Sequence, residues 1–210
     1  MTDSTDSNIH ATERATVWLT PEQIDSMRNA CYTDTTASYL RSRNDAIITV
    51  LADTGLRVGE LVQLDTGMLR NDTTELYVPT HIQKQYPTTD SPPPVTMELD
   101  TDTTRTLRSY LTGRWKDTDA VFPSRKANRI TEQGIRYVVR GAAEAAGIEP
   151  FLIDGSRGDA SRVTPHAFRH SVAYRMLHTE DENTLYDVRN RLRHSSIQTT
   201  ERVYDHFRTV

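Results

Sequence analysis

Two histidines able to perform acid–base or metal chemistry and one arginine able to bind an anion fall within one predicted helix near the C-terminal end of the chain. Thr164 is a typical helix N-cap and Pro165 suits the first helical position, so we expect a helix to begin there. His166, Arg169 and His170 then occupy positions i, i+3 and i+4, which lie on one face of a helix. This face combines a permanent cation with two imidazoles.

A zinc site is one interpretation of the two histidines. Their i, i+4 spacing matches the H-E-x-x-H motif of zinc hydrolases, but Ala167 stands where that motif has its glutamate base. Cys31 is the only cysteine, so the chain has neither an internal disulfide nor a multi-cysteine zinc site. The sequence therefore predicts no metal and no other cofactor.

Charge is distributed unevenly along the chain. The 210 residues carry 25 basic and 29 acidic side chains, and this net charge of −4 alone argues against a nucleic-acid partner. Residues 1–103 hold 7 basic and 16 acidic side chains, whereas residues 104–210 hold 18 and 13. Arginine makes up 22 of the 25 basic residues, and its guanidinium binds phosphate in a bidentate manner. An anionic ligand is therefore expected at the C-terminal half, although a Lys-poor, Asp-rich composition also suits a high-salt cytoplasm.

Composition and length favour one globular domain. Hydrophobic residues make up 36% and charged residues 26%, and no run approaches the roughly 18 apolar residues that span a bilayer. Residues 1–16 are polar and acidic, which predicts a disordered leader rather than a signal peptide. We therefore expect a cytoplasmic protein without membrane contact. The Arg157-Gly158-Asp159 triplet is then an unlikely adhesion motif, because no secretion signal accompanies it.

The elements that must position the chemistry are mostly helical. Thr20 and Gln23 around Pro21 form a capping-box pattern that starts a helix, and Gly55 interrupts a second one. Short apolar runs at 75–78 and 95–97 predict a small antiparallel sheet with a long loop, and residues 148–163 are expected to form a loop. This predicts a mainly α fold with a small antiparallel β-sheet (α+β), with helices at 38–52, 57–64, 101–112, 132–146, 184–192 and 199–207.

A set of short motifs occurs in one order along the chain. They are T-G-L-R-V-G-E-L at 54–61, a lysine at 84, P-H-A-F-R-H at 165–170, L-R-H-S-S at 192–196 and T-T-E-R-V-Y at 199–204. Together they resemble the catalytic domain of the tyrosine recombinase (phage integrase) family, particularly the integrase-like proteins of halophilic archaea. The resemblance covers about residues 17–207 and implies that residues 17–210 form one such catalytic domain.

The resemblance implies a metal-free and ATP-free cleavage and rejoining of DNA strands through a 3′-phosphotyrosyl intermediate. Phosphodiester cleavage needs a nucleophile, cations on the non-bridging oxygens and a proton for the leaving oxygen. Tyrosine needs a basic pocket to supply a phenolate at neutral pH. The matching catalytic positions, all filled here, are Arg57 and Arg169 on phosphate, His194 as a further donor, Tyr204 as nucleophile, Lys84 as general acid and His166 as base or phosphate-orienting group.

Two further residues are predicted to support the site. Glu60 lies one helical turn after Arg57 and is expected to hold its guanidinium, the alternative being a solvent-facing glutamate. His170 is expected to be a structural helix residue. Arg193 stands where the family motif has glycine, which is expected to remove an easy left-handed turn and to add a candidate DNA phosphate contact.

The expected partner is a double-stranded DNA attachment site, bound by a homo-oligomer, with a full-length integrase as a further candidate partner. Only about sixteen residues precede the catalytic fold, so no N-terminal core-binding domain is expected, and six residues follow Tyr204. Two alternatives remain open at this point. One is relaxation of supercoils by the same chemistry, as in type IB topoisomerases, and the other is a non-catalytic DNA-binding regulator of recombination.

Overall fold

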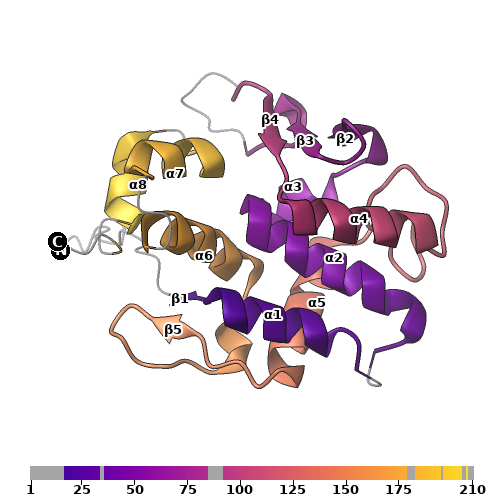
Figure 1. The fold of residues 1–210 in the computed structure, drawn as a ribbon, viewed down its shortest axis with the longest axis horizontal. Helices are drawn as coiled ribbons and strands as arrows, with labels where there is room; N and C mark the ends of the chain where they lie inside the picture. The colour runs from indigo at the N-terminus through magenta and orange to yellow at the C-terminus, as the bar shows by residue number, and fades with distance from the viewer. Residues whose placement is uncertain are drawn as a thin grey trace, which may run out of the picture.

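The structure is a computed structural model that describes residues 17–33, 36–84, 92–178, 183–194, 196–204 and 207. The predicted leader, residues 1–16, lies outside these described residues. Figure 1 shows helices around a central α2, with a small sheet on one side and α7 and α8 on another. The elements are β1 (Val17–Trp18), α1 (Pro21–Ala30), α2 (Ser38–Thr54), α3 (Val58–Val62), β2 (Leu69–Arg70), β3 (Glu75–Val78), β4 (Val95–Glu98), α4 (Thr101–Gly113), α5 (Glu132–Ala145), β5 (Phe151–Leu152), α6 (Pro165–His178), α7 (Leu185–Leu192) and α8 (Ile197–Tyr204).

Local signals set the ends of the first two helices. The Thr20 hydroxyl accepts a hydrogen bond from the Gln23 amide at 3.4 Å, and the Gln23 side chain accepts one from the Thr20 amide at 3.0 Å. The predicted capping box is therefore confirmed. Helix α2 ends at Gly55, which adopts the left-handed conformation with φ 60°. A Cβ on Gly55 would lie 2.6 Å from Leu192 Cδ2, so glycine also permits the end of α7 to approach.

Helix α2 is the centre of a large core. It packs against α1, α4, α5 and α6, and its buried residues include apolar side chains together with polar ones such as Arg43, Asp45 and Asp53. Buried polar side chains need partners inside the protein, and the Asp53 carboxylate accepts hydrogen bonds from Arg191 and from the Asp100 amide. We call this cluster the large core, and its members with no exposed area are Met27, Ala46, Ile47, Ile48, Leu51, Leu61, Val78, Tyr110, Ile135, Val139, Ala143 and Phe168.

The predicted antiparallel sheet is present and has three strands in the order β2-β3-β4. Leu76 pairs with Met97, and Val78 pairs with Val95. Leu76, Val78 and Met97 are buried, whereas the side chains between them are more accessible, as expected for a sheet with one face on a core. The pair of residues in β2 was too short to be predicted from alternation.

A second, two-stranded sheet corrects the prediction of a loop over residues 148–163. Strand β5 lies in this segment and pairs with β1, so that Trp18 is opposite Phe151. A 3₁₀-helix, Ala160–Arg162, follows in the same segment. Strands of two residues carry no periodicity, and their pairing joins residues far apart in sequence, so local patterns did not indicate it.

Helices α6, α7 and α8 surround a small core. Its buried members are Val172, Ala173, Val188, Leu192, Tyr204 and Phe207, and Trp18 and Tyr174 pack against them. Helix α8 begins at Ile197 rather than at the predicted residue 199 and is described as far as Tyr204, because residues 205 and 206 lie outside the described residues. The earlier start is explained by the Ser196 hydroxyl, which accepts a hydrogen bond from the Thr199 amide at 3.2 Å as an N-cap does.

Within the described segments, no helix is both long and apolar enough to cross a bilayer.

Helix α3 is shorter than its predicted range of 57–64, because Arg57 is its extended N-cap residue and the helix ends at Val62. Arg57 therefore lies at the entrance of the helix, between the left-handed turn at Gly55 and the first helical residue.

Candidate active site

Arg57 and Glu60 form a closed pair at the start of α3. The Arg57 amide donates to Glu60 Oε2 at 2.8 Å, and Arg57 Nη1 donates to Glu60 Oε1 at 3.1 Å. The Glu60 side chain is 2% exposed, so the solvent-facing alternative is wrong. Burial alone would raise the pKa of Glu60, but the charges of Arg193 and Arg57 outweigh it and hold the pKa below its usual value. Glu60 is therefore an anion that holds the Arg57 side chain.

Arg169, on α6, connects this turn to the end of α7. Its side chain is buried, with Nη1 donating to the Gly55 carbonyl at 2.8 Å and Nη2 donating to the Leu192 carbonyl. Burial, followed by the nearby charge of Arg57, lowers the pKa of Arg169 to about 9. These two bonds use two of the five N–H groups of a guanidinium. Arg169 thus links the turn at Gly55 to the end of α7 and lies near the positive charge of Arg57.

His194 follows α7 and faces the residues of α8. Its Nδ1 forms a hydrogen bond of 2.9 Å with the Thr200 hydroxyl. Its ring stacks on Tyr204 with centroids 5.7 Å apart and planes inclined by 10°. Burial, with the charges of Arg169 and Arg57, lowers the pKa of His194 to about 2. The imidazole is therefore neutral at physiological pH and acts as a hydrogen-bonding group.

Tyr204 is the last residue of α8 and is a member of the small core. Its side chain is among the most buried in the described residues, and Phe207 stacks on it with centroids 5.9 Å apart. Burial raises the pKa of Tyr204 to about 12, although the charges of Arg169 and Arg57 oppose this rise. The structure therefore holds Tyr204 as a neutral phenol beside two arginines.

The first two histidines of α6, His166 and His170, differ in their surroundings. His166 is exposed, whereas His170 is buried, and their rings meet edge to face with centroids 4.4 Å apart. His170 Nδ1 lies 3.2 Å from the Val17 carbonyl, and its ring contacts Tyr204 with centroids 5.8 Å apart. His170 thus connects β1, α6 and α8, which agrees with a structural role. In the described residues, no group of three or more His, Cys, Asp or Glu side chains is arranged to hold a metal ion.

Lys84 comes from a different part of the molecule, the hairpin between β3 and β4. The preceding residue, Gln83, donates from Nε2 to the Val78 carbonyl at 3.2 Å and to the Pro93 carbonyl at 2.8 Å, which closes the base of the hairpin. Lys84 itself is exposed. The remainder of the hairpin, residues 85–91, lies outside the described residues. Hydrogen bonds join Arg57 to Glu60 and Arg169 to the Gly55 and Leu192 carbonyls, and ring stacking joins His194 to Tyr204.

Arg193 differs from its prediction. It adopts the left-handed conformation, with φ 54° and ψ 51°, so the expectation that an arginine removes this turn is wrong. Its side chain is 4% exposed, and Nη2 donates to Glu60 Oε2 at 2.7 Å. The two amides that follow α7, those of Arg193 and His194, bond to carbonyls of the helix, and these bonds support the turn without glycine. The Arg193 guanidinium, a candidate phosphate contact, therefore bonds to Glu60 and does not reach the surface.

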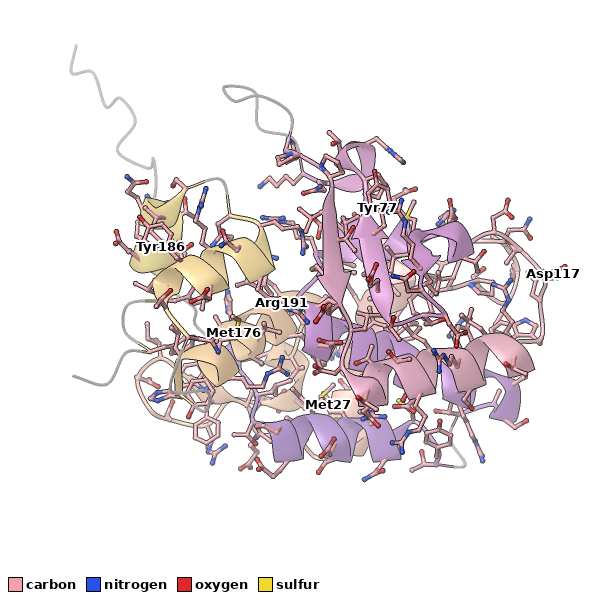
Figure 2. The ribbon with its side chains drawn as sticks, turned by 45° about the horizontal axis from the view of Figure 1, so that its top comes forward. Met27, Tyr77, Asp117, Met176, Tyr186 and Arg191 are labelled. Atoms are coloured by element: carbon pink, nitrogen blue, oxygen red, sulfur yellow. The ribbon has the colours of Figure 1, made fainter. Side chains whose placement is uncertain are left out.

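Sequence reasoning missed several residues that support the site. Arg191 bonds from Nη2 to both the carbonyl and the carboxylate of Asp53, and from Nη1 to the Glu98 carbonyl at 3.1 Å. Figure 2 shows Arg191 at the boundary between α7 and the rest of the molecule. Thr200, the partner of His194, was visible only as part of a motif. The role of Arg191 has no signal in local sequence, because it depends on contacts with residues far away in the chain. Thr200 lies six residues after His194, and their hydrogen bond depends on how α8 folds back on the end of α7.

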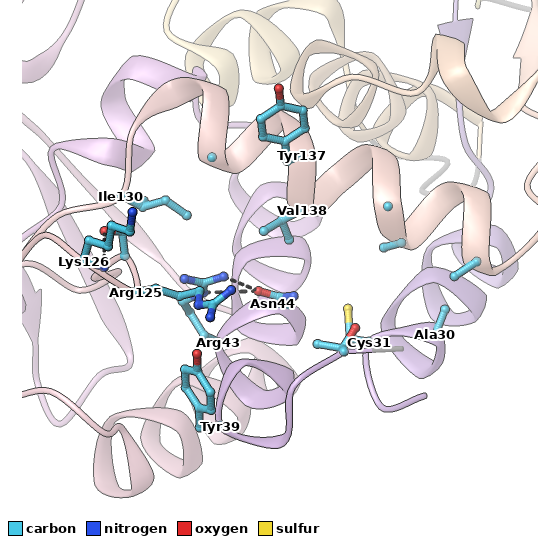
Figure 3. A pocket seen from close by; sticks show the side chains of 16 residues that line it. Ala30, Cys31, Tyr39, Arg43, Asn44, Arg125, Lys126, Ile130, Tyr137 and Val138 are labelled. Carbon is cyan, nitrogen blue, oxygen red and sulfur yellow. Dashed lines mark hydrogen bonds between the residues drawn. The ribbon is translucent and has the colours of Figure 1, made fainter. Parts of the chain in front are cut away.

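A separate hollow lies between the α1–α2 segment and α5. Tyr39, Arg43, Arg125 and Tyr137 are among its lining residues, and Arg43 bonds to the neighbouring Asn44 there (Figure 3). None of the candidate catalytic residues lines it. The candidate catalytic residues therefore lie outside this hollow.

Comparisons with known proteins agree with the fold and the motif set. Residues 17–209 match the model described as the phage integrase family. Tyrosine recombinase XerC of Roseiflexus castenholzii is 30% identical over 191 residues, covering 90% of this chain and 54% of that protein. XerC of Herpetosiphon aurantiacus is 30% identical over 194 residues, covering 90% and 55%. The chain therefore spans about half the length of these curated relatives.

Solved structures share the fold. The crystal structure of XerA recombinase has a TM-score of 0.68 at 24% identity and covers 92% of this chain and 60% of that one. XerH site-specific recombinase, bound to palindromic difH substrate in a post-cleavage complex, has a TM-score of 0.70 at 20% identity and covers 97% and 54%. The predicted fold class, mainly α with small antiparallel sheets, is confirmed. With the family model matched over residues 17–209, the chain belongs to the phage integrase family.

Proposed function

We propose that residues 17–210 act as the catalytic domain of a site-specific DNA recombinase that cleaves and rejoins strands with Tyr204 as nucleophile. One observation carries this proposal. Tyr204 stacks on His194, and the nearby charges of Arg169 and Arg57 act to lower the Tyr204 pKa. Arg57 and Arg169 belong to segments far from Tyr204 in the sequence. A tyrosine beside two arginines combines a nucleophile with the cations that a phosphodiester requires.

Each step of the proposed reaction has a donor or acceptor in this chain. Tyr204 Oη attacks the phosphorus, and the bond from phosphorus to the 5′ oxygen breaks. The phosphate stays bonded to the 3′ oxygen of the cleaved strand and is now also bonded to Tyr204. Arg57 and the remaining N–H groups of Arg169 bind the non-bridging oxygens, and neutral His194 donates a further hydrogen bond. His166 takes the phenol proton, and Lys84 protonates the leaving 5′ oxygen. Rejoining reverses these transfers, so no ATP, metal or other cofactor is needed.

The burial of Tyr204 adds a requirement to this reaction. Its side chain is 1% exposed, and its pKa is raised to about 12, so the phenol is neither accessible nor acidic in this conformation. DNA binding must therefore move α8 enough to bring Oη to the phosphate. The phosphate itself disfavours the phenolate, so the arginines must lower the tyrosine pKa once the site is hydrated and occupied.

The names of structural relatives support the proposed partners. One is XerH bound to its difH substrate, and another is a lambda integrase dimer bound to a COC′ core site. We propose that this chain likewise binds a double-stranded DNA attachment site as a homo-oligomer, in the cytoplasm, with a full-length integrase as a further partner. The 22 arginines among 25 basic residues and the 29 acidic residues support a source among halophilic archaea.

A covalent-adduct assay tests the proposed function. Duplexes that bind the protein are first selected from a random-sequence pool and then nicked near the bound site, so that the short 5′-hydroxyl fragment diffuses away after cleavage. Wild-type protein is expected to form a protein–DNA adduct that resists denaturant, and Tyr204→Phe is expected to bind the duplex equally and form none.

Two outcomes would contradict this proposal. Binding by the wild type without any adduct would favour a DNA-binding regulator of recombination. An adduct that persists in Tyr204→Phe would mean that a different nucleophile attacks. Relaxation of a supercoiled plasmid lacking the selected site would instead favour topoisomerase-like activity by the same chemistry.

A further inference from the structure

Three linked charges run from Arg193 through Glu60 to Arg57, and the first two are buried. Arg193 Nη2 donates to Glu60 Oε2 at 2.7 Å, and Arg57 donates to the same carboxylate from its amide at 2.8 Å and from Nη1 at 3.1 Å. Arg193 directly precedes His194 in the sequence, whereas Arg57 is the N-cap residue of α3. One carboxylate therefore receives hydrogen bonds from two separate parts of the candidate site.

This arrangement is costly to build. Arg193 and Glu60 have side chains only 4% and 2% exposed, so both charges have been removed from water. The Nε of Arg193 is buried without a hydrogen-bond partner among the described residues. Its backbone is left-handed, a conformation that glycine adopts without steric cost. Arginine is therefore a poor choice for the turn alone, and what it adds is the contact of its side chain with Glu60.

The other contacts of Arg193 keep its side chain inside the protein. Nη1 donates to Met97 Sδ at 3.1 Å and to the Arg191 carbonyl at 3.2 Å. Arg57 is more accessible than Arg193 and Glu60, with 21% of its side chain exposed. The guanidinium able to meet a DNA phosphate is therefore that of Arg57, and Arg193 lies behind it.

We propose that Arg193 is a positioning residue that orients Arg57 through Glu60 and fixes the position of Arg57 relative to His194. This inference rests on the proposed cleavage reaction. With Arg193 present, the Glu60 carboxylate is shared between two cations. Without it, the whole negative charge faces Arg57, which then binds Glu60 more tightly and is less available to the phosphate. Loss of Arg193 also frees the turn that carries His194 to shift relative to α3.

The test separates DNA binding from chemistry. Arg193→Met and Arg189→Met each remove one positive charge from the same helix end, and only Arg193 bonds to Glu60. On the nicked duplex described above, Arg193→Met is expected to lower the single-turnover cleavage rate of the bound complex by ~10- to 100-fold, because small misplacements of a catalytic group have effects of this size. Its dissociation constant for DNA is expected to match that of Arg189→Met, whose cleavage rate stays near that of the wild type.

Two further variants make the result specific to the ion pair. Arg193→Lys retains the charge and is expected to recover part of the cleavage rate. In a double-mutant cycle, Glu60→Gln combined with Arg193→Met is expected to be no slower than Glu60→Gln alone, because both act on Arg57 through one contact. Should Arg193→Met fail to fold, as judged by circular dichroism, Arg193→Gly takes its place, since glycine relieves the left-handed turn.

Three results would overturn the inference while the wild type still forms its adduct. The first is weaker DNA binding by Arg193→Met with an unchanged cleavage rate in the bound complex, which would make Arg193 a phosphate contact. The second is equal cleavage loss in Arg193→Met and Arg189→Met, and the third is additivity with Glu60→Gln. Absence of the adduct in the wild type would instead reject the proposed function itself.

Discussion

The large core and the small core divide the candidate active site between them. Arg57 and Glu60 belong to α3, which packs against α5 on the large core, whereas Tyr204 lies within the small core beside His194. Helix α6 spans both, since Phe168 is buried in the large core and Val172 in the small one. The proposed phosphate-binding arginine and the proposed nucleophile are thus supported by hydrophobic clusters of very different size.

Three arginines make polar contacts between the parts of the molecule that hold the two cores. Arg169 on α6 donates to the Gly55 carbonyl that follows α2, and Arg191 on α7 donates to the Asp53 carboxylate of α2. Arg193, which follows α7, donates to Glu60 of α3. Each such bond contributes only about 0.5–3 kcal/mol net, because water can replace either partner when the bond opens. Buried apolar area has no such substitute. We therefore expect these polar contacts to open more readily than the apolar contacts within either core.

A leucine truncation in the large core is the strongest test of its dominance. Leu51 has no exposed area, so Leu51→Ala is expected to lower the free energy of unfolding by ~2–5 kcal/mol through lost burial and a residual cavity. Urea denaturation would measure this loss. DNA binding and cleavage should fall together, in proportion to the unfolded fraction. A cleavage loss without a change in the unfolding midpoint would contradict the assignment of Leu51 to the main stabilising cluster.

The same truncation in the small core should have a smaller and more local effect. Leu192 also has no exposed area, and Leu192→Ala is expected to cost ~2 kcal/mol, because α7 and α8 can collapse around the gap. Amide hydrogen exchange should accelerate in α7 and α8 and stay slow in α2. Cleavage should fall by more than DNA binding. Equal acceleration in α2 would mean that the two cores unfold as one unit.

Acidification should act on the small core through His194 and have the smallest effect of the three. Its pKa falls from about 6.5 to about 2 on burial, so below pH 6.5 the unfolded chain takes up a proton that the folded chain does not. Stability is therefore full above pH 6.5 and is lost as the pH falls, by up to ~1.4 kcal/mol per pH unit. Denaturation of the wild type and His194→Gln between pH 7 and pH 5 should show a shallower loss in the variant.

The control for this titration is His81→Gln, which replaces an exposed histidine of the sheet region. Its stability should follow the wild type across the same pH range. A parallel pH dependence in the wild type and His194→Gln would show that another group causes the acid loss, and it would remove the assignment of this titration to the small core.

Local signals predicted much of the fold. The capping box at Thr20, the glycine after α2 and the alternation at residues 75–78 each involve neighbours in the sequence, and each was confirmed. The pairing of β1 with β5 was not predictable, because two-residue strands have no period and their partners are far apart. The start of α8 was misplaced because Ser196 was not recognised as its cap.

The candidate site follows the same division. Residue types and their order along the chain identified Arg57, Lys84, His166, Arg169, His194 and Tyr204, together with the family to which the chain belongs. Tertiary structure alone decided that Glu60 is buried and that Arg193 turns inward to meet it. It also decided that Tyr204 is a buried phenol in the smaller of two cores. Burial, ion pairing and pKa depend on which distant segments meet, and no spacing within a motif encodes those distances.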